Sequence, residues 1–249
     1  MSPKLIDDAT RDAREQEIMQ TAIEVIARDG VSGLTIEKVV AKVPYSKGTV
    51  YNHFSCKEDL LTALCNTCVR KLADVFQRAT SFDGNSRERM LAIGFGYMLH
   101  SMLNPTEFML VITAKTPSVT EKATLKRQEE HQLLEAQLLG QMLNLIDSAI
   151  QQGELQLPAH MAPEQVTFSL WAMSFGTIAL LQDSVERCGV RQEMMLEREL
   201  INNASVLLDG LNWRPFTQEH DWQKSVQRMK DTVFAPEVAA LEAQANCPG

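Results

Sequence analysis

The stretch VPYSKGTVYNHFSCKEDL, Val43 to Leu60, decides the fold of this sequence. Pro44 disfavours helical geometry in the residue before it, so a helix ends at that point. Ser46 is a good N-cap, and Tyr45 and Val50 on either side of it form the hydrophobic staple of a new helix. The stretch therefore predicts the end of one helix, a tight turn and the start of a second helix.

The second helix is predicted to have a polar outward face. Its apolar anchors are Val50 and Phe54, and at about 100° per residue the opposite side and its edges carry Lys47, Gly48, Thr49, Tyr51, Asn52 and His53. Glycine lets a backbone approach base edges, while lysine, hydroxyl and imidazole groups offer donors to bases and phosphates. Such a helix-turn-helix is typical of proteins whose second helix enters the major groove of DNA. Composition alone fits a solvated helix with scattered polar residues equally well.

The residues before the turn predict two further helices. Apolar residues recur at four-residue spacing over about residues 11–29, and Gly30 stands where a left-handed cap would end that helix. Thr35 can cap the next helix, which is only about two turns long and whose apolar stripe is Ile36, Val39, Val40 and Val43. Three helices thus make an N-terminal helix-turn-helix domain.

The rest of the chain predicts helices and lacks the alternating β-branched runs of strands. They are expected at about 57–79, 87–103, 105–114, 119–152, 163–187, 191–211, 218–232 and 236–245. A capping box, Ser118 to Glu121, opens the long one. We predict an all-α protein with a helix-turn-helix domain at 1–60 and a larger helical domain at 61–249, which ends in an extension after Trp213.

The chain is acidic overall, yet its lysines gather near the turn. The formal net charge is -8, and residues 1–60 contain eight Lys and Arg against ten Asp and Glu. Between Lys38 and Lys57 there are four lysines and His53 but no acidic residue. The net charge therefore argues against nonspecific binding to polyanions through the whole surface, and any nucleic-acid contact must be local.

The cysteines predict a reduced, cytoplasmic protein. Cys56, Cys65, Cys68, Cys188 and Cys247 are odd in number and lack secretory spacing. The most apolar run, 166–181, is interrupted by polar residues and is too short to cross a membrane. Thiol-based redox sensing stays open as an alternative, because a helix N-terminus and a lysine would lower the pKa of the Cys56 thiol.

No residue pattern predicts catalysis, a cofactor or a metal. The sequence contains no HExxH, no GxSxG and no phosphate-binding glycine loop, and its histidines are dispersed. The run Glu129, Glu130 and His131 is interpreted as a charged patch on the exposed face of the long helix. We therefore predict a protein that is not an enzyme.

Residues 18–61 resemble the DNA-binding domain of TetR-family transcriptional regulators. The string SKGTVYNHFSCKEDLL carries the resemblance, together with a first helix ending in glycine and a threonine opening the second. Pro44 stands where the family usually has glycine, and Val40 where it has alanine. The resemblance implies DNA contacts by Thr35, Lys47, Thr49, Tyr51, His53 and Lys57, to which Gly48 and Asn52 of the same face are added.

For the larger domain, the resemblance implies a homodimer and an apolar ligand cavity. Helices 166–181 and 191–211 would form the dimer interface, and a small molecule would release a repressor from a palindromic double-stranded DNA operator. Adaptable or aromatic candidates for the cavity wall are Phe95, Met98, Met102, Phe108, Ile112, Met142, Trp171 and Phe175. Ordinary core packing explains each of these singly, and a ligand-binding scaffold that no longer binds DNA remains an alternative.

Overall fold

The structure, a computed structural model, describes residues 7–182 and 189–246. Within these ranges the chain forms helices and no strand longer than one antiparallel bridge, between Leu155 and Trp213. The predicted all-α class is confirmed. The chain divides into two compact units, which are described separately. Unit 1 comprises the residues up to Val69 together with Pro105–Leu134, and unit 2 comprises Arg70–Asn104 together with the residues from Glu135 onward.

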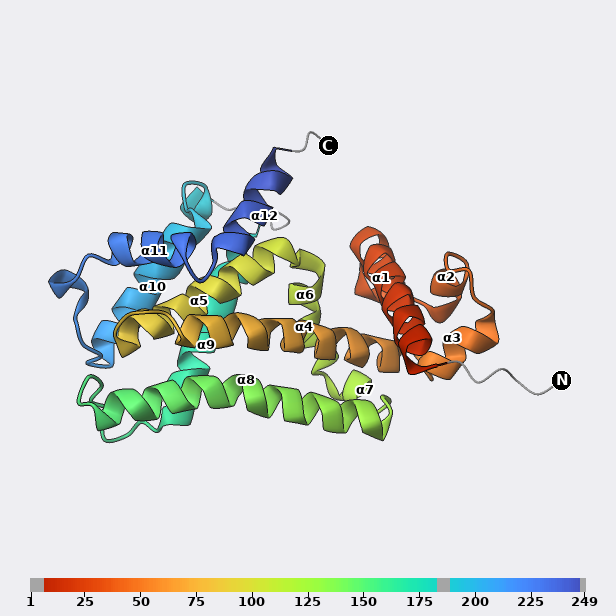
Figure 1. Ribbon diagram of the computed structural model, residues 1–249, viewed down its shortest axis with the longest axis horizontal. Helices are drawn as coiled ribbons and strands as arrows, with labels where there is room; N and C mark the ends of the chain where they lie inside the picture. The colour runs from red at the N-terminus through yellow and green to blue at the C-terminus, as the bar shows by residue number, and fades with distance from the viewer. Residues whose placement is uncertain (1–6, 183–188, 247–249) are drawn as a thin grey trace. The chain divides into compact units, whose positions relative to one another are not determined.

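Unit 1 contains the predicted helix-turn-helix, and α1, α2 and α3 are grouped together in Figure 1. The predicted boundary at residue 60 lies inside α4, and the unit also includes two segments that the prediction assigned to the second domain, residues 61–69 and 105–134. Its elements are α1 (Asp8–Gly33), α2 (Ile36–Val40), α3 (Lys47–His53), the first part of α4 (Lys57–Thr80), α6 (Pro105–Ala114), α7 (Pro117–Thr120) and the start of α8 (Leu125–Gln151).

Local capping sets the geometry of the turn. The Thr35 hydroxyl accepts a hydrogen bond from the Lys38 amide at 3.2 Å, and the Ser46 hydroxyl accepts one from the Thr49 amide at 3.1 Å. Both N-caps were predicted. In α1, Gly30 has φ 72°, a value that favours glycine, and regular helical geometry is interrupted there as expected. Val50 and Phe54 are fully buried, so the polar side of α3 faces outward.

The predicted start of the long helix is wrong. The predicted capping box lies on the short helix α7, which ends at Thr120 with Glu121 as its C-cap, and α8 begins only at Leu125. The buried Asp59 carboxylate of α4 accepts hydrogen bonds from the Thr124 amide at 3.0 Å and from the Thr124 hydroxyl at 2.8 Å. A side chain remote in sequence therefore satisfies the N-terminus of α8, which local sequence patterns cannot reveal.

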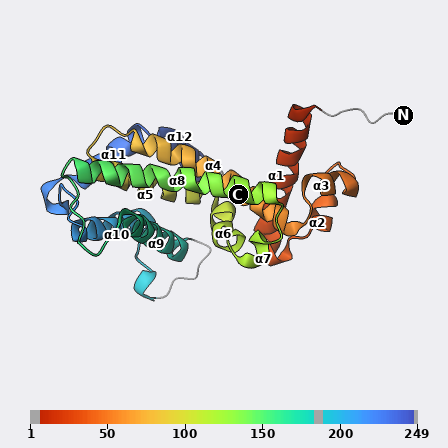
Figure 2. The ribbon, with the colours of Figure 1, turned by 90° about the horizontal axis from the view of Figure 1, so that it is seen from below.

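Unit 2 is built around α5, which packs against α9, α10, α11 and α12. Figure 2 shows α9 and α10 running alongside each other in this unit. Besides the later parts of α4 and α8, the described elements of this unit are α5 (Ser86–Leu103), α9 (Pro163–Leu181), η1 (Gly189–Arg191), α10 (Leu196–Gly210), η2 (Thr217–Glu219), α11 (Trp222–Asp231) and α12 (Ala235–Ala245). The prediction placed the end of α9 and the start of α10 too close together, and residues 183–188 lie outside the described ranges.

The segment after Trp213 is part of the core of unit 2. Phe234 is fully buried, and its ring centroid lies 5.9 Å from that of Phe95. It fills the space left by Gly96, where an added Cβ would come within 2.7 Å of the Phe234 ring. Arg78 donates hydrogen bonds to the Val233 carbonyl and to a carboxylate of α12. The C-terminal helices therefore complete the packing around α5.

Among the described helices, none is both long enough and apolar enough to cross a membrane. The apolar helix α9 has buried and exposed sides, which is the pattern of a helix that packs on one side within its own chain.

Candidate nucleic-acid interface

The outward face of α3 presents the side chains that the sequence predicts to contact DNA. Lys47, Gly48, Tyr51 and Asn52 are exposed, and Thr49 is half-buried. A Cβ built on Gly48 would meet only the Ser46 hydroxyl, at 3.9 Å. Packing within the chain therefore does not require glycine at this position, and the absence of a side chain leaves the backbone open to an approaching partner.

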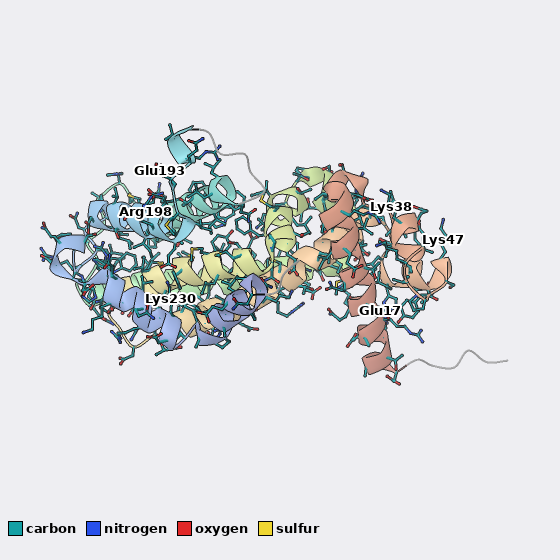
Figure 3. All side chains as sticks on the ribbon, turned by 90° about the horizontal axis from the view of Figure 1, so that it is seen from above. Glu17, Lys38, Lys47, Glu193, Arg198 and Lys230 are labelled. Atoms are coloured by element: carbon teal, nitrogen blue, oxygen red, sulfur yellow. The ribbon has the colours of Figure 1, made fainter. Side chains whose placement is uncertain are left out.

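The lysines around the turn are all engaged within unit 1. Lys38 pairs with Asp29 at 2.7 Å, Lys42 lies 4.0 Å from Glu24, and Lys47 pairs with Glu37 at 3.2 Å. The ammonium of Lys57 donates to the Val31 carbonyl at 2.8 Å. Figure 3 labels Lys38 and Lys47 on α2 and α3. The positive charge that the sequence gathers here is thus largely balanced by neighbouring carboxylates or carbonyls.

His53 and Lys57 have partners inside the unit. The His53 side chain is only 6% exposed, and its Nδ1 lies 3.3 Å from Glu15 Oε2. Lys57 holds the C-terminal end of α1 through backbone carbonyls, since Ser32 also accepts from it at 3.4 Å. Their contact with DNA stays a prediction, while the geometry supports a role for both in holding α1 against the recognition elements.

Glu15 links three segments of unit 1. It accepts a hydrogen bond from Arg127 at the start of α8 and lies beside His53 at the end of α3. Burial raises the pKa of the Glu15 carboxyl, but the bond from Arg127 and its charge outweigh that effect, so the pKa lies below its ordinary value. The Arg127 guanidinium also lies 5.7 Å from the centre of the Phe54 ring. This cluster fixes the C-terminal end of α3.

The interpretation of Glu129, Glu130 and His131 as one exposed patch is wrong for two of the three. Glu130 and His131 are half-buried, and both contact the buried Asn66 of α4, with His131 Nδ1 2.9 Å from Asn66 Oδ1. Only Glu129 is exposed. These residues pack the start of α8 onto α4.

Sequence reasoning missed Asp59, Glu15, Arg127 and Glu37, which organise unit 1. Three of them act across large separations along the chain, and no local pattern marks them. Glu37 could have been found, because it directly precedes the basic stretch on α2 and helical geometry places it near the turn.

The predicted cavity residues divide between the two units. Phe108 and Ile112 belong to unit 1, where Phe108 is buried and Ile112 is exposed. The other six belong to unit 2, and they comprise the buried Phe95, Met98 and Met142, the exposed Met102, and the half-buried Trp171 and Phe175. Phe95 packs on Phe234, so at least one of them has a role in the core of unit 2.

Two of the three described cysteines are buried, and the third forms hydrogen bonds with backbone groups. Cys65 and Cys68 are buried in α4, and Cys56 lies at its N-terminus, where Sγ accepts from the Asp59 amide at 3.4 Å and donates to the Lys122 carbonyl at 3.4 Å. Cys188 and Cys247 lie outside the described residues. Redox sensing through the thiols stays an untested alternative.

Comparison with known proteins relates these features to a family. Residues 18–64 match the model for bacterial regulatory proteins of the tetR family. The transcriptional repressor AcnR of Corynebacterium diphtheriae is 36% identical over 62 residues, which make up 25% of this chain and 33% of that protein. The matches to curated relatives span between 18% and 39% of those proteins' own length.

Solved structures extend the likeness of fold to most of the chain. A regulatory protein of the tetR family from Rhodococcus RHA1 has a TM-score of 0.58 at 15% identity, covering 80% of this chain and 95% of that one. The transcriptional regulator FadR from Bacillus subtilis, solved with stearoyl-CoA, has a TM-score of 0.60 at 15% identity, covering 78% and 98%. At such identities the likeness shows the fold.

The fold and the site together define a helix-turn-helix protein with an additional helical unit. Residues 18–64 match the model of the tetR family of bacterial regulatory proteins, and most of the chain has a fold similar to that of a solved protein of this family.

Proposed function

We propose that this protein is a transcriptional regulator that binds a palindromic DNA operator through α3. The observation that carries the proposal is the face of α3, which exposes Lys47, Gly48, Tyr51 and Asn52 while Val50 and Phe54 anchor the helix in the core. Donor-bearing side chains around an open glycine are the chemistry that base edges and phosphates require. Thr35, Thr49 and Lys57 are proposed as flanking phosphate contacts.

A homodimer through α9 and α10 is part of this proposal. Large apolar side chains are exposed on both helices: Phe168 is 63% exposed, Leu180 55% and Val206 74%. The rings of Phe168, Trp171 and Phe175 follow one another along α9 at 6.4 and 6.1 Å. Covering these surfaces removes apolar area from water. Two copies of α3 would then read half-sites about 34 Å apart.

We further propose that a small apolar ligand bound in the larger domain releases the protein from DNA, as in a repressor. The support is the adaptable apolar composition of unit 2 and the relative FadR, which was solved with stearoyl-CoA. Release would follow from a population shift, because a coupling of about 1–3 kcal/mol changes DNA affinity about 5- to 150-fold. Repression and the ligand's identity rest on this analogy.

DNA binding is tested by selection from random duplexes followed by Gly48→Asp. The wild-type protein should enrich a palindrome, and the added carboxylate should weaken binding to it by at least about 100-fold, since like charges brought together cost several kcal/mol. The open space at Gly48 lets the variant fold. Ala27→Asp, the same charge change at an exposed position of α1, should leave binding within a fewfold of wild type.

If no duplex is enriched, the DNA-binding function is refuted and the ligand-binding scaffold becomes the better account. Circular dichroism of both variants shows whether the helical fold has been kept.

The dimer is tested by Phe168→Glu. Sedimentation velocity should give a particle of twice the 27.9 kDa chain mass for the wild type. A charge in place of an aromatic anchor should raise the dimer dissociation constant by at least about 30-fold. Leu133→Glu is the control, because Leu133 is similarly exposed at 68% but lies on α8 in unit 1. Equal effects of the two substitutions would refute the α9–α10 interface.

A further inference from the structure

Glu37 lies where the two helices of the helix-turn-helix meet and holds two predicted DNA contacts at once. Its Oε1 accepts from Lys47 Nζ at 3.2 Å and from the Tyr51 hydroxyl at 3.4 Å. Lys47 Nζ in turn lies 5.6 Å from the centre of the Tyr51 ring. One carboxylate on α2 therefore arranges a lysine and a tyrosine of α3 into a small cluster.

The cluster is open to solvent and reversible. The Lys47 and Glu37 side chains are each 61% exposed, and exposed ion pairs are weak. A hydrogen bond from its own backbone amide and then the Lys47 ammonium lower the pKa of Glu37, so the carboxylate is ionised at neutral pH. DNA phosphates can therefore compete with Glu37 for Lys47, but only by breaking an existing pair.

We infer that Glu37 is a specificity-determining residue, which keeps Lys47 and Tyr51 in one arrangement and withholds them from nonspecific phosphate contacts. This inference rests on the proposed DNA-binding function. On a random duplex, a lysine contributes mainly by neutralising phosphate and releasing counterions. Glu37 suppresses that contribution. On the operator, the intact cluster presents Lys47 and Tyr51 in the orientation that the target sequence matches, so the pair need not break.

The charge balance of unit 1 supports this reading. The other lysines of the basic stretch also have partners, with Lys38 on Asp29, Lys42 on Glu24 and Lys57 on backbone carbonyls. In each of these three contacts, the lysine and the group that it contacts lie outside α3. Glu37 acts on exposed side chains of α3, whereas Glu15 contacts the mostly buried side chain of His53 at the end of that helix. The effect of Glu37 should therefore depend on the DNA sequence.

The test is Glu37→Gln. Affinities for the selected operator and for a random duplex are measured at salt concentrations from about 50 to about 200 mM. In a plot of log affinity against log salt concentration, a slope of about 0.9 corresponds to one phosphate contact. Binding to the random duplex should strengthen about three- to tenfold, with a slope steeper by about 0.9 per subunit. Operator affinity should change less than about twofold, because the glutamine amide oxygen still accepts hydrogen bonds from Lys47 and Tyr51 and the base contacts of the operator hold both side chains in the same orientation. The ratio of operator to random affinity should therefore fall about three- to tenfold.

Glu24→Gln is the matched control. Glu24 is 59% exposed and lies 4.0 Å from Lys42, so the substitution removes the same charge beside another lysine, outside α3. It should strengthen binding to both duplexes by the same factor. If Glu37→Gln does likewise, or changes neither affinity, the inference is wrong.

A double-mutant cycle adds a second criterion. In a Lys47→Ala background, Glu37→Gln should lose its selective effect on the random duplex, since the lysine it releases is absent. A persisting effect would also overturn the inference. A wild-type protein that selects no duplex refutes the proposed function itself, whereas a selective wild type with an unselective Glu37 effect refutes only the role of Glu37.

Discussion

Phe234→Ala is expected to lower the free energy of unfolding by about 3–5 kcal/mol. Phe234 is fully buried in unit 2, lies against the Phe95 ring and fills the notch that Gly96 leaves. The Arg78 guanidinium lies 5.8 Å from the centre of its ring. Removing the ring leaves a cavity that Gly96 cannot fill. The loss of stability therefore has two parts, the lost transfer free energy of the apolar ring and the cost of the cavity. The C-terminal helix α12 should detach more readily as a result.

Urea denaturation at a fixed protein concentration measures the effect, because the stability of a dimer depends on concentration. Phe216→Ala is the control, since it makes the same chemical change at a half-buried position of the same unit. It should cost less than half as much. If the two substitutions cost the same, or if Phe234→Ala costs under about 1 kcal/mol, the C-terminal segment is an appendage and not part of the core.

Arg87→Met is expected to destabilise the protein by a similar amount, about 3–5 kcal/mol. Arg87 is 1% exposed and pairs with Asp209 at 2.6 Å. Its guanidinium also donates to the Trp213 carbonyl at 2.6 Å and to the Thr217 hydroxyl at 2.9 Å, and it lies 4.7 Å from the centre of the Trp222 ring. Methionine keeps much of the volume but donates no hydrogen bond, so several acceptors lose their partner.

The same denaturation experiment applies, with Lys224→Met as control. Lys224 is an exposed residue of α11, and its substitution should change the free energy of unfolding by less than about 0.5 kcal/mol. If Arg87→Met left the free energy of unfolding almost unchanged, an apolar side chain would replace the ion pair without loss of stability. In that case Arg87 would not be what holds the segment after Trp213 to α5.

Much of the helix-turn-helix could be predicted from the sequence because its signals are local. Thr35 and Ser46 cap the helices that follow them. The helix before the turn, α2, ends at Val40, which is earlier than the end at Val43 predicted from Pro44. The alternation of buried Val50 and Phe54 with polar neighbours turns α3 outward. Each signal acts within one or two turns of chain, a distance over which helical geometry is fixed.

Local sequence patterns did not reveal the contacts that distant side chains supply. Asp59 caps α8 from another helix, so the long helix begins at Leu125 and not at the capping box. His53 lies on an edge of the polar face by helical geometry, but Glu15 of α1 draws its ring into the unit. Lys57 turns likewise to the carbonyls that end α1. Sequence patterns report on residues that are close along the chain and not on residues that only folding brings together.

The sequence by itself determined the all-helical class, the position of the turn and the identity of the outward face of α3, because helix periodicity and capping are local. The tertiary structure decided which groups pair with the lysines around the turn. Every lysine of the basic stretch finds a carboxylate or a carbonyl that folding brings near. It also decided that the segment after Trp213 belongs to the core, since only packing brings Phe234 to Gly96. Coulombic and packing contacts depend on distance in space, which only the folded chain sets.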